Sequence, residues 1–286
     1  MGFIKKLKHK YIWKRIFYER LTEPLHLNII SIFVYLFGSY KLKSDFDLIL
    51  RPQHAFSLFK VAEIAANEGK NRATIIEFGV ANGAGLYNIQ NIAEKVTKHT
   101  GIKFDIYGFD TGEGMPPPSS FKDHPDLYSE GDFPMDFKNL QNSLNENTKL
   151  IIGKINKTLP EFMNQSFEES PISFISIDVD YYSSTIEALD ILKMQSNQYL
   201  SKVVLYLDDL EDDSHNSWCG ELAAINEFSD NSKFRKIEKH AFLRSNRIFK
   251  NAKWIDHIFY AHILDHEIRN KIFIKKNKTI LENPLI

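Results

Sequence analysis

The chain has 286 residues, of which 43% are hydrophobic and 26% charged, a globular composition long enough for one full domain with an appendage. Its formal net charge is -1, so no overall positive field favours nucleic acid as a partner. The single cysteine, Cys219, excludes an intramolecular disulfide and a cysteine-based zinc site, and it fits a reducing cytoplasm.

Residues 1–50 are expected to form a helical extension ahead of a main domain that covers residues 51–286. Residues 1–20 contain seven lysines and arginines against one acid, with apolar residues interleaved. The apolar stretch over residues 27–37 is too short to span a bilayer, and no small-residue cleavage site follows it, so a secretory signal is not expected. We favour packing of the extension on the main domain or on a second subunit of a homodimer. The alternative is a basic amphipathic segment, residues 1–37, that lies on an anionic membrane surface of a cytoplasmic protein.

After an expected linker at residues 45–52, apolar residues recur at helical spacing over residues 53–68, and Gly69 closes this predicted helix. Short runs of β-branched and large apolar residues then alternate with helical patterns. This alternation predicts an α/β fold with a doubly wound parallel sheet. The expected strands are residues 73–78, 104–109, 150–153, 173–177 and 203–207, and the expected helices are residues 86–97, 137–144, 159–163, 185–193 and 219–228.

Two further segments complete the chain. Residues 111–135 are rich in glycine, proline, serine and aspartate, and a loop of this length inside a compact domain usually serves function, often as a lid. Two strand-like runs in the tail, residues 255–263 and 271–275, are expected to be closing edge strands of the sheet.

A glycine-rich turn follows the first predicted strand. Gly79 and Gly83 lie between that strand and the next helix, where the backbone could approach a ligand and the helix offers free N–H groups. Glu77 ends the same strand, and Asp110 ends the second strand, where an acid would bind ribose hydroxyls. No phosphate-binding lysine motif follows, so the pattern favours an adenosine cofactor without phosphates. A tight strand-to-helix turn with no ligand is the alternative.

Two acidic clusters follow buried strands: Asp178 and Asp180 after residues 173–177, and Asp208 and Asp209 after residues 203–207. Ligands of open α/β sheets bind outside the carboxyl ends of the strands, so four carboxylates would converge there. Because unpaired carboxylates repel each other, we expect a hard divalent cation with oxygen ligands. The aspartates could instead cap the following helices.

The roles within these clusters stay open from the residues alone. The spacing does not decide whether Asp178 or Asp180 is the direct metal ligand, and Asp180 could equally be a general base. Two histidines, His124 in the expected lid and His215 beyond the second cluster, could act as a base near neutral pH.

Several of these motifs together resemble a known family. The segments 77–83 (EFGVANG) and 107–116 (YGFDTGEGMP) resemble class I S-adenosylmethionine-dependent methyltransferases. The segments 177–185 (IDVDYYSST) and 207–209 (LDD) look like the macrocin O-methyltransferase (TylF-type) branch. The likeness covers roughly residues 70–230. Two departures, Val179 where a glycine is common and the continuation LEDD at residues 210–213, bear on the substrate.

The resemblance implies a seven-stranded Rossmann-like sheet and a magnesium ion that holds vicinal oxygens of a sugar. It assigns S-adenosylmethionine binding to Glu77, Gly79, Gly83 and Asp110, and metal binding to Asp178, Asp208 and Asp209.

The sequence therefore predicts a metal-assisted O-methyltransferase that acts on a hydroxyl of a sugar or glycosylated small molecule, in surface-polysaccharide or natural-product biosynthesis. Asp180 and His124 are the candidate catalytic residues. One alternative is a nicotinamide-dependent oxidoreductase. It needs a more regular glycine turn and a Tyr/Lys or His proton-transfer set at the strand ends, and no Tyr-x-x-x-Lys motif starts at Tyr181. Another is a non-catalytic scaffold on the same fold.

Overall fold

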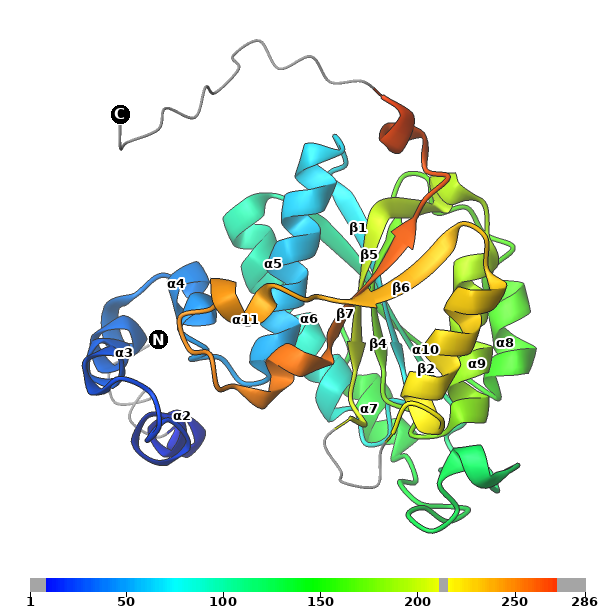
Figure 1. Cartoon of the computed structure of the whole chain (residues 1–286), viewed down its shortest axis with the longest axis horizontal. Coiled ribbons are helices and arrows are strands. Elements are labelled where there is room, and N and C mark those ends of the chain that lie inside the picture. Colours follow the sequence, from blue (N-terminus) through cyan, green and yellow to red (C-terminus); the bar gives the residue numbers. More distant parts are fainter. Residues whose placement is uncertain (1–8, 211–215, 272–286) are drawn as a thin grey trace, which may run out of the picture.

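The structure, a computed structural model, describes residues 9–210 and 216–271. A seven-stranded sheet has the order β3-β2-β1-β4-β5-β7-β6 (Figure 1). All neighbouring strands from β3 to β5 are parallel, whereas β7 runs antiparallel to both β5 and β6. The strands are β1 Arg72–Phe78, β2 Lys103–Asp110, β3 Thr148–Ile152, β4 Ile172–Ile177, β5 Tyr199–Leu207, β6 Arg235–Lys239 and β7 Ile258–Ile263.

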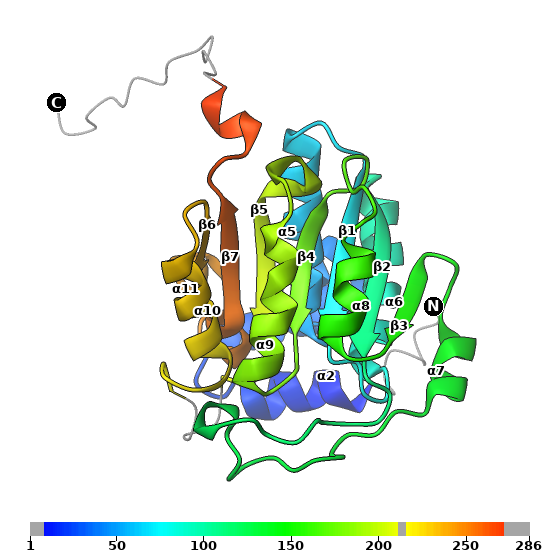
Figure 2. The ribbon, with the colours of Figure 1, turned by 90° about the vertical axis from the view of Figure 1, so that its right-hand side faces the viewer.

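Helices cover both faces of this sheet, so the central strands are buried on both sides. Figure 2 shows α8 and α9 in front of the sheet and α5 and α6 behind it. Every residue of β4 is buried, and its sequence ISFISI accordingly contains no charged side chain and has apolar residues facing both sides of the sheet. The helices are α5 Pro52–Asn67, α6 Ala84–Thr100, α7 Phe137–Ser143, α8 Ile155–Phe162, α9 Tyr182–Leu189, α10 Gly220–Asn231 and α11 Leu243–Asn246.

These findings confirm the predicted α/β fold with seven strands, but one strand was not expected. β6 has the sequence RKIEK, which resembles a solvated segment because an edge strand carries charges that discourage pairing with another chain. Of the two strands expected in the tail, residues 255–263 contain β7, while residues 272–275 lie outside the described residues.

The N-terminal extension is helical and packs on the main domain. It comprises α2 Lys10–Lys14, a π-helical turn Arg15–Glu19, α3 Leu25–Phe37 and α4 Tyr40–Asp45. Its buried side chains form a small core of their own with residues 46 and 48 and with Phe249. Residues 46–49, expected as a linker, are thus buried between the extension and the domain. A buried ion pair at 2.6 Å joins Arg247 to Asp47 across this junction.

Candidate active site

A pocket of about 660 Å³ opens at the carboxyl ends of the central strands. The chain order reverses between β1 and β4, because β2 and β3 lie on one side of β1 while β4 and β5 lie on the other. Such a switch point leaves a crevice at which open α/β sheets bind ligands. The glycine turn, the acidic residues that follow β4 and β5, and the long loop of residues 111–135 all line this pocket.

The glycine turn brings the end of β1 against the end of β4. Gly79 has a φ of +81°, and a Cβ at this position would lie 1.6 Å from the backbone oxygen of Asp178. Only glycine fits there. Gly83, with a φ of +80°, precedes the first residue of α6, so the N-terminus of that helix faces the pocket.

Glu77 lies beneath this turn with an unsatisfied carboxylate. Its side chain is buried, and Oε2 has no hydrogen-bond partner among the described residues. Burial, followed by the nearby charge of Asp178, raises the pKa of Glu77 well above its ordinary value. A Cβ on Gly85 would lie 2.1 Å from Oε1 of Glu77, so the glycine at this position makes room for the carboxylate. A buried acceptor that lines a pocket is suited to a donor group of a ligand.

Asp110 supports the same turn from β2. Its Oδ2 accepts hydrogen bonds from the backbone N–H groups of Val80 and Ala81, both at 2.8 Å, and its Oδ1 accepts one from Gly112 at 2.7 Å. The carboxylate also lines the pocket. Asp110 therefore holds the glycine turn in shape besides facing any ligand.

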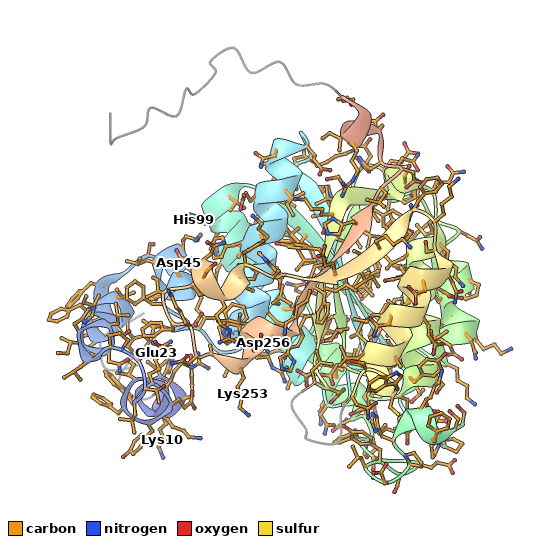
Figure 3. All side chains as sticks on the ribbon, viewed as in Figure 1. Lys10, Glu23, Asp45, His99, Lys253 and Asp256 are labelled. Atoms are coloured by element: carbon orange, nitrogen blue, oxygen red, sulfur yellow. The ribbon has the colours of Figure 1, made fainter. Side chains whose placement is uncertain are left out.

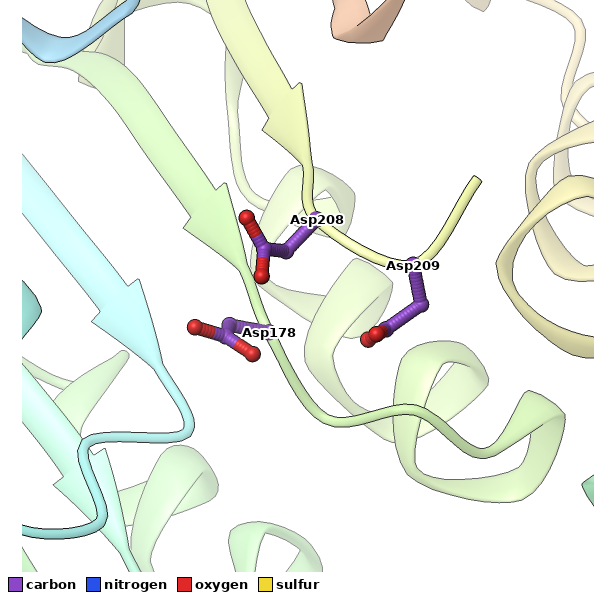
Figure 4. A group of neighbouring side chains, drawn as sticks. All are labelled: Asp178, Asp208 and Asp209. Carbon is purple, nitrogen blue, oxygen red and sulfur yellow. The ribbon is translucent and has the colours of Figure 1, made fainter. Parts of the chain in front are cut away.

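Three of the predicted acids meet in one group (Figure 4). One carboxylate oxygen from each of Asp178, Asp208 and Asp209 lies within 4.8 Å of the other two. Burial and the neighbouring carboxylates raise the pKa of Asp178 to about 8 and that of Asp209 to about 9. Oδ2 of Asp209 is buried without a hydrogen-bond partner among the described residues. A hard divalent cation fits this set, because it takes oxygen ligands and neutralises their mutual repulsion.

Asp180 lies beside this group rather than in it. Its backbone is left-handed, with a φ of +57°, and its side chain lines the pocket. Burial raises the pKa of Asp180, while a hydrogen bond with Tyr128 of the long loop opposes that shift. The geometry therefore groups Asp178, not Asp180, with the two aspartates that follow β5.

Two side chains that sequence reasoning missed hold this acidic group in place. The hydroxyl of Tyr206, on β5, donates a 2.5 Å hydrogen bond to Oδ1 of Asp208 and accepts one from Nε2 of Gln53. Glu221 is buried in the first turn of α10 and accepts a hydrogen bond from the backbone N–H of Asp209 at 3.2 Å. In the sequence, Tyr206 and Glu221 are marked only as polar side chains within segments whose apolar pattern predicts burial.

The long loop, residues 111–135, covers the pocket and is fastened at its centre. Apart from a short 3-10 turn, Phe121–Asp123, it has no helix or strand. The buried carboxylate of Asp123 accepts hydrogen bonds from the backbone and hydroxyl groups of both Ser119 and Ser183. Ser183 belongs to α9, so Asp123 ties the loop to the sheet's helical layer. We refer to residues 111–135 as the lid.

Of the two candidate histidines, the structure describes only His124, which does not join the acidic group. His124 is buried beside Gly220, the first residue of α10, and is not among the side chains that line the pocket. His215 lies outside the described residues. A cation that the sequence did not reveal does line the pocket: Arg51, whose φ is +53° and whose charge lowers the pKa of both Glu77 and Asp178 against the larger effect of their burial.

No family model and no curated protein matches the chain. Among solved structures, it is similar to CalS11, a calicheamicin methyltransferase, with 15% identity over 92% of this chain and 93% of that chain and a TM-score of 0.50. The apo structure of CalS11, a TDP-rhamnose 3'-O-methyltransferase of calicheamicin biosynthesis, gives 14% identity, coverage of 88% and 91%, and a TM-score of 0.42. An O-methyltransferase from Bacillus cereus in complex with SAH gives 13% identity over 89% of this chain and 96% of that chain, with a TM-score of 0.42.

At this level of identity the likeness concerns the fold. The chain has the Rossmann-like fold of class I methyltransferases, as its sequence motifs implied.

Proposed function

We propose that this protein is an S-adenosylmethionine-dependent O-methyltransferase, assisted by a divalent cation such as Mg²⁺, that acts on a hydroxyl of a sugar or glycosylated small molecule. One observation carries the proposal. The carboxylates of Asp178, Asp208 and Asp209 form a group in the same pocket as the glycine turn. A cofactor at the turn and a metal-held acceptor would therefore be neighbours.

Cofactor binding is assigned to the β1–α6 side of the pocket. Gly79 and Gly83 keep side chains out of the turn, and the N-terminus of α6 lies behind it. The unsatisfied Oε2 of Glu77 is suited to a donor group of the cofactor. Asp110 keeps the turn in place. Because it ends β2, it is also the acid that we expect to bind the ribose hydroxyls of the cofactor.

Acceptor binding is assigned to the β4–β5 side. Asp178, Asp208 and Asp209 would hold the cation, with Tyr206 fixing the orientation of the Asp208 carboxylate. When bound, the cofactor supplies an electrophilic methyl group, and the cation lowers the pKa of the acceptor hydroxyl and orients it. Asp180 lines the pocket beside them and is the favoured residue to receive the hydroxyl proton. His124 stays a second candidate that would need the lid to move.

The acceptor class rests on the resemblance to macrocin O-methyltransferases together with the fold shared with CalS11, a calicheamicin methyltransferase. Sugars bearing vicinal hydroxyls, free or as nucleotide sugars, are the first acceptors to test, because two adjacent oxygens can bind one cation together.

Calorimetric titration of S-adenosylmethionine and S-adenosylhomocysteine into the protein, with Mg²⁺ and then with a chelator, tests the assignment. We expect both ligands to bind, and methyl transfer to a sugar acceptor to be lost in chelator. In Asp208→Asn, Mg²⁺ binding should weaken at least about tenfold. The matched control, Asp230→Asn, changes an exposed aspartate on α10 outside the pocket and should behave as the wild type.

Binding of a nicotinamide dinucleotide without binding of either methyltransferase ligand would overturn the proposal in favour of an oxidoreductase. Full methyl transfer in the presence of chelator would refute the role of the metal, while the proposed cofactor would stand.

A further inference from the structure

The helix α3, Leu25–Phe37, has apolar side chains on both its buried and its exposed side. It buries Val34 and Tyr35 in the small core together with the polar Asn28 and Ser31, and it also exposes large apolar side chains at a spacing of three to four residues. Helices at the surface of globular proteins normally carry polar residues on the exposed side. The exposed side chains on α3 are Leu25 (74% exposed), Ile29 (51%), Ile30 (43%), Phe33 (62%) and Phe37 (76%).

This orientation is fixed by polar contacts on the buried side. Arg20 is buried, lies 3.6 Å over the ring centroid of Phe249, and donates to the backbone oxygen of Phe46 at 2.7 Å. It also donates to the hydroxyl of Ser31, and its own backbone oxygen accepts from Nδ2 of Asn28 at 3.0 Å. Turning α3 to bury its exposed apolar side chains would break these bonds, so their exposure is built into the fold.

The apolar surface continues into the segment that leads to α3, where Phe17, Tyr18 and Leu21 are 53%, 71% and 75% exposed. So many large exposed apolar side chains within 21 residues of sequence favour an interaction site. We call the exposed apolar side chains of residues 17–37 the docking face.

Basic residues accompany the docking face. Lys10 projects into solvent from α2 (Figure 3), and the side chain of Lys14 is 72% exposed. Residues 1–50 contain nine lysines and arginines and four aspartates and glutamates, so their formal net charge is +5. Since the whole chain has a net charge of -1, the remaining residues have a net charge of -6. The positive charge is therefore concentrated in the part of the chain that presents the docking face.

This positive charge favours one of the two partners that could cover the docking face, a membrane rather than a second copy of the chain. In a two-fold dimer the docking face would meet its own copy, and two positively charged segments would repel each other. An anionic bilayer offers both an apolar layer and negative headgroups. No helix among the described residues is long and apolar enough to cross a membrane, so the docking face suits a surface contact rather than a span.

We propose that the docking face binds the protein peripherally to anionic phospholipid membranes, with its apolar side chains at the acyl boundary and its lysines among the headgroups. Figures 1 and 2 show α2 and the lid toward the same end of the molecule, the end at which β1, β4 and β5 terminate.

Co-sedimentation of the full chain with vesicles tests this proposal without reference to methyl transfer. We expect binding to vesicles of phosphatidylcholine and phosphatidylglycerol at about a 2:1 ratio, and at least about tenfold weaker binding to pure phosphatidylcholine. Ile29→Asp/Phe33→Asp should weaken binding at least about tenfold, because charges replace the apolar side. Lys10→Glu/Lys14→Glu should also weaken it, and raised salt should mimic that change.

A matched control is available where β6 begins and β7 ends, at the end of the sheet away from the pocket. Phe234 and Leu264 are adjacent, joined by a backbone hydrogen bond, and are 42% and 41% exposed, so Phe234→Asp/Leu264→Asp should bind vesicles as the wild type does. Circular dichroism and melting would confirm that each variant is folded. Absence of wild-type binding, or equal loss in the control, would refute the proposal. A dimer that Ile29→Asp/Phe33→Asp dissociates, with no vesicle binding by the wild type, would assign the docking face to a second copy instead.

Discussion

Replacing Tyr206 by phenylalanine should weaken divalent-cation binding without disturbing the fold. The Tyr206 hydroxyl is the hydrogen-bond donor to Oδ1 of Asp208, at 2.5 Å, and the tyrosine ring is 5% exposed. A hydrogen bond to a charged group contributes about 1.5–3 kcal/mol. Phenylalanine fills nearly the same space, so the loss is confined to the hydroxyl. We expect the Kd of Mg²⁺ to rise by about 10- to 100-fold, the range seen when partners of metal ligands are removed.

Calorimetric titration of Mg²⁺ or Mn²⁺ into both proteins measures this change directly. The matched control is Tyr260→Phe, on the adjacent strand β7, because the Tyr260 hydroxyl is buried and has no hydrogen-bond partner among the described residues. Cation binding should be unaltered in this control. The reasoning is refuted if Tyr206→Phe binds the cation as tightly as the wild type does, or if both variants lose affinity equally.

Three further predictions concern the turn, the lid and pH. Gly79→Ala should fail to give folded protein, because its Cβ would lie 1.6 Å from a facing carbonyl oxygen. Gly69→Ala, at a similar φ but in open space, should lose only about 1–2 kcal/mol of stability in thermal unfolding. Similar melting of the two variants would contradict this prediction. Asp123→Ala removes four hydrogen bonds, so limited proteolysis should cut the lid faster than in the exposed-site control Asp126→Ala, and equal rates would argue against the anchor. Burial raises the pKa of Asp209 to about 9 from its ordinary 3.8, so the metal-free folded protein holds a proton that the unfolded chain releases above about pH 4. The stability of the metal-free protein should therefore fall as pH rises toward 9. The gain in Tm from Mg²⁺ should be larger near pH 8.5 than near pH 6, and a gain that does not depend on pH would contradict this reasoning.

The strands that build the pocket were predictable because their signature is local. β1, β4 and β5 are buried on both faces, and burial on both faces favours sequences rich in β-branched and large apolar residues. β6 was not predictable, because an edge strand with four charged residues among its five has the composition of a loop. The meeting of the acids at one rim followed from the parallel order of β4 and β5 alone.

Other parts of the site have no local signature. Gln53 reaches Tyr206 across 153 residues of sequence, and Asp123 reaches Ser183 across 60. The choice between Asp178 and Asp180 depends on packing: the carboxylate of Asp180 contacts Tyr128 and Asp209, but it is not one of the three that face one another. Such contacts depend on how distant segments pack, which residue spacing does not encode.

The sequence by itself determined the order of the strands β1 to β5 and of the helices between them, the glycine turn and the acids at the strand ends, because each depends on neighbouring residues and on the alternating periods of helix and strand. Only the tertiary structure decided which three carboxylates face one another and which side chains orient them. It also decided that α3 leaves one row of large apolar side chains exposed. The buried contacts of Arg20 with Ser31 and with the backbone of Phe46 fix that orientation, and they form only when the extension packs on the domain.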